Sequence, residues 1–391
     1  MPNYFAYFPE QAELLPRHVR DELAPGHLCF LIHEVIEAQE LRRFDQAYSE
    51  EGQQAYPPRM MLKVWLYGFA VNVRTTRKLE RRIQEDLGFR FLAGGLRPDH
   101  KTLSEFLRWQ GEAIEERFTQ VLGWVRRAGM ARLGRVAIDS TRIKANASPD
   151  RLEQQDRRQV RGWRQQMEAE DPDQEPGLEV GAEQAQRLRQ QMERGGAEEV
   201  RPAKRSATDP DARFLRERGG RFRLGYSGEI AVSEDHFVVA VRATQNTTDN
   251  ASLLPMVAEV ERQCRARPEK VLADSGFYSC ENLDQLDAQG IDGYVPDSNL
   301  ARELNTGQRA TGVGRNRLRH RETCRMRQKL RRPAGRKIYM ERKALVEPVI
   351  GTLKEHRGMR QFLRRGLAGV TLELVLAALS YNLTHYHQLQ R

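Results

Sequence analysis

Two short apolar runs, each followed by an aspartate, most constrain how this chain can fold. Asp139 follows the run at 136–138, and Asp274 follows the run at 271–273. Short apolar runs of this kind are typical of buried strands, and open α/β sheets bind their ligands beyond the carboxyl ends of their strands. A single aspartate in such a position is often only a turn or cap residue. Two of them on separate strands predict a shared site.

The surrounding pattern predicts an α/β domain built on a mixed sheet. Apolar runs at 222–232 and 237–244 flank the turn residues Ser233, Glu234 and Asp235, which indicates an antiparallel hairpin. A further strand is expected at 293–295, and helices are expected at 252–264, 281–289, 341–355 and 370–383. Strands that come first in a group and then alternate with helices predict a mixed sheet flanked by helices on both sides.

The chain before the predicted α/β domain is predicted to be helical. Residues 59–73 are almost continuously apolar, which at this length favours a buried helix over a strand. Thr75 or Thr76 can begin a second helix, and Asp99 can cap a third. Three short helices with basic residues at their turns resemble a helix-turn-helix DNA reader, although helical scaffolds without DNA are common. We therefore predict a helical DNA-binding domain at 1–130 and a catalytic domain at 131–391, interrupted by a polar helical insertion at 148–208.

Positive charge is concentrated in one segment. Residues 301–343 contain 15 Lys/Arg against 3 Asp/Glu, whereas the whole chain carries a formal charge of only +10. Because like charges repel one another, such a concentration favours an arm that follows DNA phosphates, with a solvated basic loop as the alternative. The residues predicted to contact DNA are Arg331, Arg332 and Arg336 in this segment, and Arg74, Arg77, Lys78 and Lys101 in the helical domain.

Other features exclude several classes of protein. No stretch reaches the ~20 uncharged apolar residues that a membrane span needs, and the first residues lack the basic and apolar regions of a signal peptide. We therefore expect a cytoplasmic protein without a membrane partner. The four cysteines form no C-x-x-C pair, which argues against a zinc ribbon and against a disulfide framework.

Three carboxylates form a candidate catalytic set: Asp139, Asp274 and Glu347, the last on the predicted helix 341–355. Two Mg²⁺ ions ~3.5–4 Å apart can activate an attacking oxygen and stabilise a leaving oxygen in phosphodiester chemistry, and Mg²⁺ prefers oxygen ligands. We assign Asp139 as the ligand that bridges both ions. Lys343 and Lys354 lie on the helix face of Glu347, where a network of surface ion pairs is the alternative explanation.

A family resemblance supports this set. The segments AIDSTRIKANAS (137–148), VLADSGFYS (271–279) and YMERKALVEPVIGTLKEHRGMRQFLRRGL (339–367) resemble the three blocks of bacterial insertion-sequence DDE transposases. The similarity is to superfamilies four and five, particularly the eleven-eighty-two group, and residues 56–106 resemble the N-terminal helical domain of that group. The resemblance reaches from about 56 to 383, with 148–208 unmatched.

The resemblance implies an RNase H-like core in which Asp139, Asp274 and Glu347 bind two Mg²⁺ or Mn²⁺ ions. It implies nicking of double-stranded DNA at terminal inverted repeats, followed by attack of the freed 3′-hydroxyl on target DNA. Enzymes of this kind usually act as homodimers on paired ends, and a bacterial member would work at the nucleoid. In hairpin-forming relatives an aromatic side chain holds a flipped base, and Trp163 in the insertion is a weak candidate for this role.

The last block resembles a signature of the form Y-x2-R-x3-E-x6-K, whose basic residues contact element-end DNA. Tyr339 and Arg342 keep the first spacing, and Glu347 and Lys354 keep the last, but four residues instead of three separate Arg342 from Glu347. On an ideal helix Lys343, and not Arg342, shares the face of Glu347. The phosphate contact is therefore assigned to Arg342, Lys343 or both.

Two other functions are compatible with parts of this pattern. A domesticated transposase could bind DNA without cutting it, but all three carboxylates and Lys354 are present. An RNase H-like nuclease could act on another substrate, such as an RNA–DNA hybrid, but the helical domain and the basic segment fit recognition of DNA ends better. The sequence therefore favours a DNA transposase.

Overall fold

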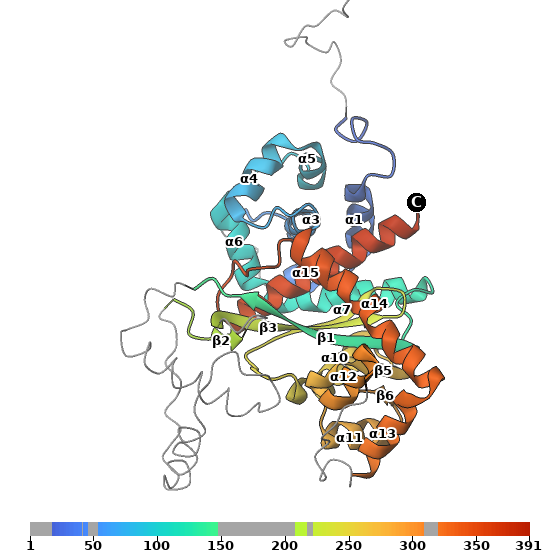
Figure 1. Cartoon of the computed structure of the whole chain (residues 1–391). Helices are drawn as coiled ribbons and strands as arrows, with labels where there is room; N and C mark the ends of the chain where they lie inside the picture. The colour runs from blue at the N-terminus through green and yellow to red at the C-terminus, as the bar shows by residue number, and fades with distance from the viewer. Residues whose placement is uncertain (1–17, 41, 46–53, 148–207, 217–221, 309–319) are drawn as a thin grey trace, which may run out of the picture.

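A computed structural model describes residues 18–40, 42–45, 54–147, 208–216, 222–308 and 320–391 (Figure 1). Apart from Thr208, the predicted insertion at 148–208 lies outside the described residues, and so does Trp163. The predicted domain boundaries and the helical character of the insertion stay predictions.

The described part of the N-terminal third contains helices and no strands. These are α1 (Leu28–Glu37), α2 (Arg42–Asp45), α3 (Pro58–Ala70), α4 (Thr76–Glu85), α5 (Leu87–Ala93), α6 (His100–Trp109) and α7 (Gly111–Arg127). Nearly every residue of α3 is buried, which confirms the buried helix expected at 59–73. The Asp99 carboxylate accepts a hydrogen bond from the Thr102 backbone N–H at 2.7 Å, so the predicted cap of α6 is also confirmed. Thr75 precedes α4, but its hydroxyl caps no backbone group.

A mixed sheet forms the centre of the remaining chain. Its strands are β1 (Arg135–Lys144), β2 (Arg213–Arg216), β3 (Phe222–Ser233), β4 (Val238–Thr244), β5 (Lys270–Ala273) and β6 (Asp292–Tyr294). Their order is β2-β3-β1-β5-β6, and β4 also pairs with β3. The β3–β4 pair is antiparallel, as the hairpin prediction requires, whereas β5 runs parallel to both β1 and β6. The mixed sheet predicted from the sequence is therefore confirmed.

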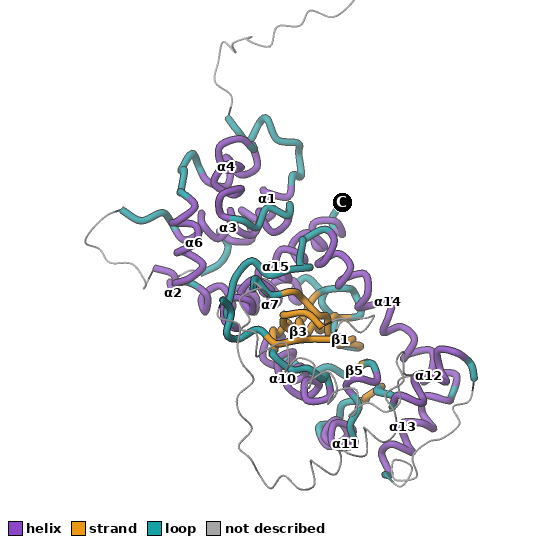
Figure 2. The backbone as a smooth tube through the Cα atoms, turned by 60° about the vertical axis from the view of Figure 1, so that its left-hand side comes forward, coloured by secondary structure: helices purple, strands orange, loops and turns teal. Residues whose placement is uncertain are grey.

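Helices cover both faces of this sheet. They are α10 (Leu253–Cys264), α11 (Cys280–Ala288), α12 (Ser298–Thr306), α13 (Arg321–Arg331), α14 (Pro333–Glu355) and α15 (Leu367–Leu389), with short 3₁₀ turns η2 (Asn250–Ser252) and η3 (Ser275–Phe277). In Figures 1 and 2, α14 and α15 lie on one side of the sheet and α10 lies on the other. α15 is long and apolar enough to cross a membrane, but 72% of its apolar window is buried inside the protein, as in the core helix of a globular domain.

Two predicted element boundaries were wrong. Asp139 does not end its strand, because β1 continues to Lys144 by pairing with β3 after its pairing with β5 has stopped. The helix expected at 341–355 begins at Pro333, since proline suits the first turn of a helix, where no backbone N–H is needed. Arg336 and Tyr339 therefore lie on α14, and Arg331 lies on α13.

Candidate functional site

Asp139 and Asp274 lie side by side where the parallel pairing of β1 and β5 ends. The last parallel pair joins Ile138 to Ala273, and each aspartate is the residue that follows this pair in the chain. An Asp274 oxygen accepts a hydrogen bond from the Gly276 backbone N–H at 2.9 Å, which fixes the carboxylate in the turn that follows β5. The two aspartates are close enough for the charge of one to raise the pKa of the other. The structure thus brings together two of the three predicted carboxylates.

Burial and the Arg342 guanidinium shift the pKa of the Asp139 carboxyl in opposite directions. Its side chain is 19% exposed, and this burial, with a smaller contribution from Asp274, raises its pKa to about 6. Arg342 opposes the shift by donating from Nη1 to Oδ2 at 3.1 Å, and the Ser140 backbone N–H donates to Oδ1 at 2.8 Å. A carboxylate in this setting is stabilised in its charged form by any nearby cation.

The structure does not bring Glu347 to the two aspartates. Arg342 is the residue of α14 that faces Asp139, and five residues along a helix correspond to a rotation of about 140°. Glu347 is accordingly exposed, while Val346 beside it is buried. Among the described residues, no three His, Cys, Asp or Glu side chains converge closely enough to hold one metal ion. In this arrangement the two aspartates suit a divalent cation by the chemistry of their oxygen donors, and Glu347 does not complete their site.

The basic residues of α13 and α14 have different surroundings. Arg342 is buried and paired with Asp139, whereas Lys343 is exposed, so only Lys343 is open to a phosphate in this arrangement. Tyr339 is buried next to Arg342, and Lys354 is half-buried. Arg331 forms two hydrogen bonds with Glu303 at 3.0 and 2.9 Å, Arg336 donates to the Leu304 carbonyl at 3.1 Å, and Arg332 is exposed.

An open groove of about 700 Å³ lies where α4 and α6 begin. We call it the basic groove, and it is lined by Thr75, Thr76, Arg77, Lys78, His100, Lys101 and Ser104. Helix N-termini present backbone N–H groups and a partial positive charge that favour anions. The groove adds three cationic side chains and several hydroxyls. The structure thus gathers three of the four helical-domain residues predicted to bind DNA.

Arg74, the fourth helical-domain residue predicted to bind DNA, instead forms an ion pair and hydrogen bonds within the protein. Its Nη1 donates to Oε1 of Glu373 at 2.7 Å, and the two side chains are only 8% and 2% exposed. Its Nη2 donates to the carbonyls of Gly358 and Gln361. Arg74 therefore joins the N-terminal helices to α15 and to the loop before it, and a DNA phosphate cannot reach it here. The sequence prediction did not anticipate this partner, because Glu373 lies almost 300 residues away in the chain.

Comparisons with known families identify the chain. A transposase domain (DUF772) matches residues 17–109, and a transposase DDE domain matches residues 130–383, which is more than half of the 391 residues. The chain belongs to the DDE transposase family. It is a DNA transposase, and DDE transposases use divalent metal ions.

Other comparisons add little to the assignment of this transposase. No curated protein matches it. Two chains of solved structures match, among them one in the crystal structure of a pre-cleavage Mos1 transpososome. That match has 10% identity, covers 82% of the transposase and 98% of the other chain, and has a TM-score of 0.19.

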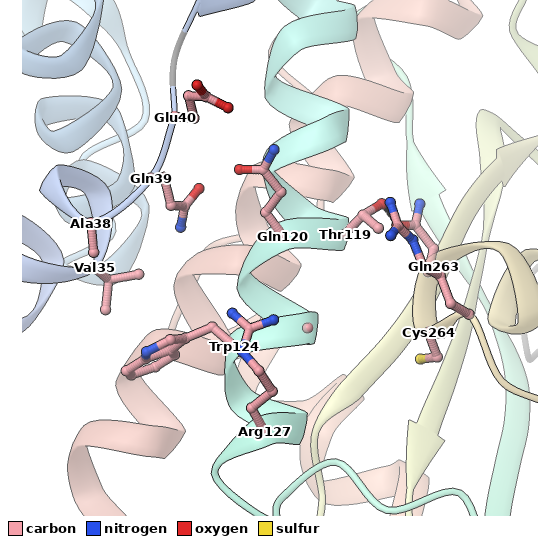
Figure 3. A pocket seen from close by; sticks show the side chains of 12 residues that line it. Val35, Ala38, Gln39, Glu40, Thr119, Gln120, Trp124, Arg127, Gln263 and Cys264 are labelled. Atoms are coloured by element: carbon pink, nitrogen blue, oxygen red, sulfur yellow. Dashed lines mark hydrogen bonds between the residues drawn. The ribbon is translucent and has the colours of Figure 1, made fainter.

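A second cavity, of about 350 Å³, lies between α1, α7 and α10 of the transposase (Figure 3). Trp124 and Arg127 line one side, and Gln39 and Gln263 extend amides toward the space. The cavity lies beside the end of α10, before β5 begins, whereas Asp274 follows the other end of β5. It is therefore separate from the acidic site.

Sequence reasoning missed one acidic residue of this region, Asp249. It lies in the polar turn between β4 and η2, and burial together with the nearby Asp274 raises its pKa. Arg142 on β1 lies 3.4 Å from its carboxylate. Asp249 follows no apolar run of its own, so the sequence carries no signal that would separate it from an ordinary turn residue.

Proposed function

We propose that this transposase nicks double-stranded DNA at the terminal inverted repeats of its element and joins the freed 3′-hydroxyl to target DNA. The proposal rests mainly on the adjacency of Asp139 and Asp274 just beyond the last parallel pair of β1 and β5. We further propose an RNase H-like core, supported by antiparallel strands β1, β3 and β4 next to parallel strands β5 and β6. The assignment to the eleven-eighty-two group rests on the three sequence blocks.

Mg²⁺, or Mn²⁺ in its place, is the proposed cofactor, with Asp139, Asp274 and Glu347 as its ligands and Asp139 as the bridge. The ions would supply activation of the attacking oxygen and stabilisation of the leaving oxygen. Within the chain, Arg342 favours the charged form of Asp139, and Gly276 donates its backbone N–H to Asp274. Because Glu347 is exposed on α14, the proposal requires its side chain to join the aspartates only in the DNA complex.

We propose that the basic groove and the exposed Lys343 contact the phosphates of the element end. Lys354, Arg331, Arg332, Arg336 and Tyr339 stay proposed members of the DNA interface, together with Arg77, Lys78 and Lys101. Each neutralised phosphate releases counterions, so binding through these residues weakens steeply with salt. We also propose a homodimer on paired ends, acting in the cytoplasm at the nucleoid.

The position of Glu347 favours one alternative. If Glu347 never joins Asp139 and Asp274, the protein would bind DNA without cutting it, as a catalytically silent transposase. An RNase H-like nuclease acting on another substrate gains no specific support from the structure.

The deciding experiment follows a labelled duplex of the element's own terminal repeat. Wild type and Glu347→Gln are incubated with Mg²⁺, with Mn²⁺ and with EDTA, and an RNA–DNA hybrid serves as a second substrate. Metal-dependent cleavage of the duplex that Glu347→Gln abolishes would establish the proposed function. Tight binding of the duplex without cleavage by either protein would identify the silent DNA-binding protein, and cleavage of the hybrid alone would identify the nuclease.

A further inference from the structure

Asp274 lies in a turn that the pairing of the strands does not hold. The parallel pairing of β5 with β1 ends at Ala273, and η3 (Ser275–Phe277) follows Asp274 directly. The Asp274 carboxylate begins this turn by accepting a hydrogen bond from the Gly276 backbone N–H at 2.9 Å. The direction of the carboxylate therefore depends on the position of η3, which contacts outside the sheet must determine.

The side chain of Asn282 supplies such a contact. Asn282 lies on α11 and is 5% exposed, and its Nδ2 donates to the carbonyl of Phe277, the last residue of η3, at 2.8 Å. Nδ2 also donates to the carbonyl of Asn250, the first residue of η2, at 2.7 Å. An amide nitrogen carries two hydrogens, so this single buried side chain joins η2 to η3.

The η2 turn is itself anchored to the sheet. The hydroxyl of Ser252, the last residue of η2, donates to Oε1 of Glu229, and the Thr244 hydroxyl donates to the same oxygen at 2.9 Å. Glu229 is completely buried on β3, which pairs with β1 on the side away from β5. A hydrogen-bonded path thus runs from β3 through η2 and Asn282 to the turn of Asp274.

The stability of α11 alone does not account for this amide. The Ser279 hydroxyl caps the helix by accepting a hydrogen bond from the Asn282 backbone N–H at 3.0 Å, and Leu283 and Leu286 bury its apolar side. An apolar side chain would suffice for packing here, since burying a polar group is costly unless that group is hydrogen-bonded. Both hydrogen bonds of Nδ2 go to the turns η2 and η3, the second of which carries Asp274 at its start.

We propose that Asn282 is a positioning residue for the reaction, which sets the place of the Asp274 carboxylate relative to Asp139 by joining η3 to η2. This inference rests on the proposed function, in which both aspartates bind a divalent cation. Asn282 acts through the turn of Asp274 and not as a ligand. Ligands must be held within roughly 0.5 Å of their productive geometry, and the residues that orient them typically contribute about 10–100-fold to metal affinity or activity.

The test measures Mn²⁺ binding to the full chain without DNA by isothermal titration calorimetry. Asn282→Leu is expected to weaken binding roughly 10–100-fold; Asn282→Ala takes its place if the leucine variant does not fold. Asn382→Leu is the matched control, because Asn382 is also completely buried and its amide forms hydrogen bonds of 2.9 and 2.8 Å with the backbone of Val238, at the start of β4. Both leucine variants should lower the thermal midpoint, but Asn382→Leu should bind Mn²⁺ as wild type does.

Asp274→Asn separates failure of this inference from failure of the proposed function. Weakened binding by Asp274→Asn beside wild-type affinity in Asn282→Leu would overturn the inference and leave the proposed metal site standing. Equal losses of affinity in Asn282→Leu and Asn382→Leu would also overturn it, because they would reflect general destabilisation. Wild-type affinity in Asp274→Asn would contradict the proposed metal site itself.

Cleavage of the element-end duplex gives a second readout. Asn282→Leu should cleave roughly 10–100-fold more slowly at a saturating concentration of DNA. Its affinity for the duplex in EDTA should stay at that of wild type, because Asn282 is buried. A lowered affinity for DNA with an unchanged cleavage rate would assign Asn282 a general role in the fold and contradict the positioning role.

Discussion

Arg342 donates a hydrogen bond to Asp139 across 3.1 Å and thereby joins α14 to β1. Both side chains are largely buried, with 8% and 19% of their surfaces exposed. Removing one member of such a pair leaves the other as a buried charge without a partner, which is far more costly than the pair itself is favourable. The pair therefore contributes to the stability of the site and opposes the rise that burial causes in the pKa of Asp139.

The first prediction concerns the dependence of stability on pH. Because the pKa of Asp139 rises to about 6 on folding, from an ordinary value of 3.8, the native state holds this proton more tightly than the unfolded chain does. The stability from this group is fully present below about pH 4 and is lost as pH rises through about 6. Asp139→Asn cannot ionise, so at pH 8 its free energy of unfolding should exceed that of wild type by up to about 3 kcal/mol, less the cost of leaving Arg342 unpaired.

Urea unfolding of both proteins at pH 5 and pH 8 checks this expectation. The advantage of Asp139→Asn over wild type should be larger at pH 8 than at pH 5. An advantage that is equal at the two pH values would show that the Asp139 carboxyl titrates in the folded protein as it does in the unfolded chain.

The second prediction separates two adjacent basic residues of α14. Lys343→Met should lower affinity for element-end DNA and reduce the slope of log affinity against log salt by about one, with an unchanged thermal midpoint, because Lys343 is exposed. Arg342→Met should instead lower the thermal midpoint at pH 8, because it leaves Asp139 without its guanidinium. Fluorescence anisotropy across a salt series and thermal melts measure the two effects, and a loss of stability in Lys343→Met would contradict the assignment.

The third prediction tests the basic groove. Arg77→Met, Lys78→Met and Lys101→Met should each reduce the salt slope of DNA binding by about one, and their combination should reduce it by about three. Arg267→Met is the matched control, because Arg267 is an exposed arginine just after α10, paired with Glu261 at 2.7 Å. Equal losses in the control and the groove variants would mean that only the overall charge attracts DNA.

Much of the fold could be predicted because burial leaves a local pattern in the sequence. The β3–β4 hairpin, β5 and α10 consist of apolar residues at strand or helix spacing, and each forms where the pattern indicates. The full extent of β1 could not be predicted in this way. Its second half, from Ser140 to Lys144, has Ile143 as its one apolar residue and is stabilised by pairing with β3, a partner that lies more than eighty residues away.

The basic segment shows why the site was only partly predictable. Its concentrated charge indicated a single arm for phosphates, yet Arg327 is buried against Asp297, with two hydrogen bonds at 2.7 and 2.6 Å. Lys329 likewise bonds to Asp292 and to the Gly293 carbonyl. The two members of each pair lie 30 or more residues apart in the chain. The sequence therefore does not show which Lys and Arg side chains are paired with an acidic residue. Arg74 was predicted to contact DNA for the same reason, because its partner Glu373 lies far away in the chain.

The last prediction concerns the buried Arg74–Glu373 pair. Arg74→Met should lower the free energy of unfolding by roughly 3–5 kcal/mol, because Glu373, at 2% exposure, would lose the guanidinium that pairs with it. Glu373 also accepts hydrogen bonds from the backbone N–H groups of Leu363 and Arg364. A glutamine at 373 keeps an oxygen for these donors but carries no charge, so Arg74→Met combined with Glu373→Gln should be more stable than Arg74→Met alone. Arg77→Met, one turn along and outside the pair, is the control, and urea unfolding measures all four proteins. A double variant less stable than Arg74→Met would show that the hydrogen bonds of Glu373, and not the pairing of its charge, hold the N-terminal helices against α15.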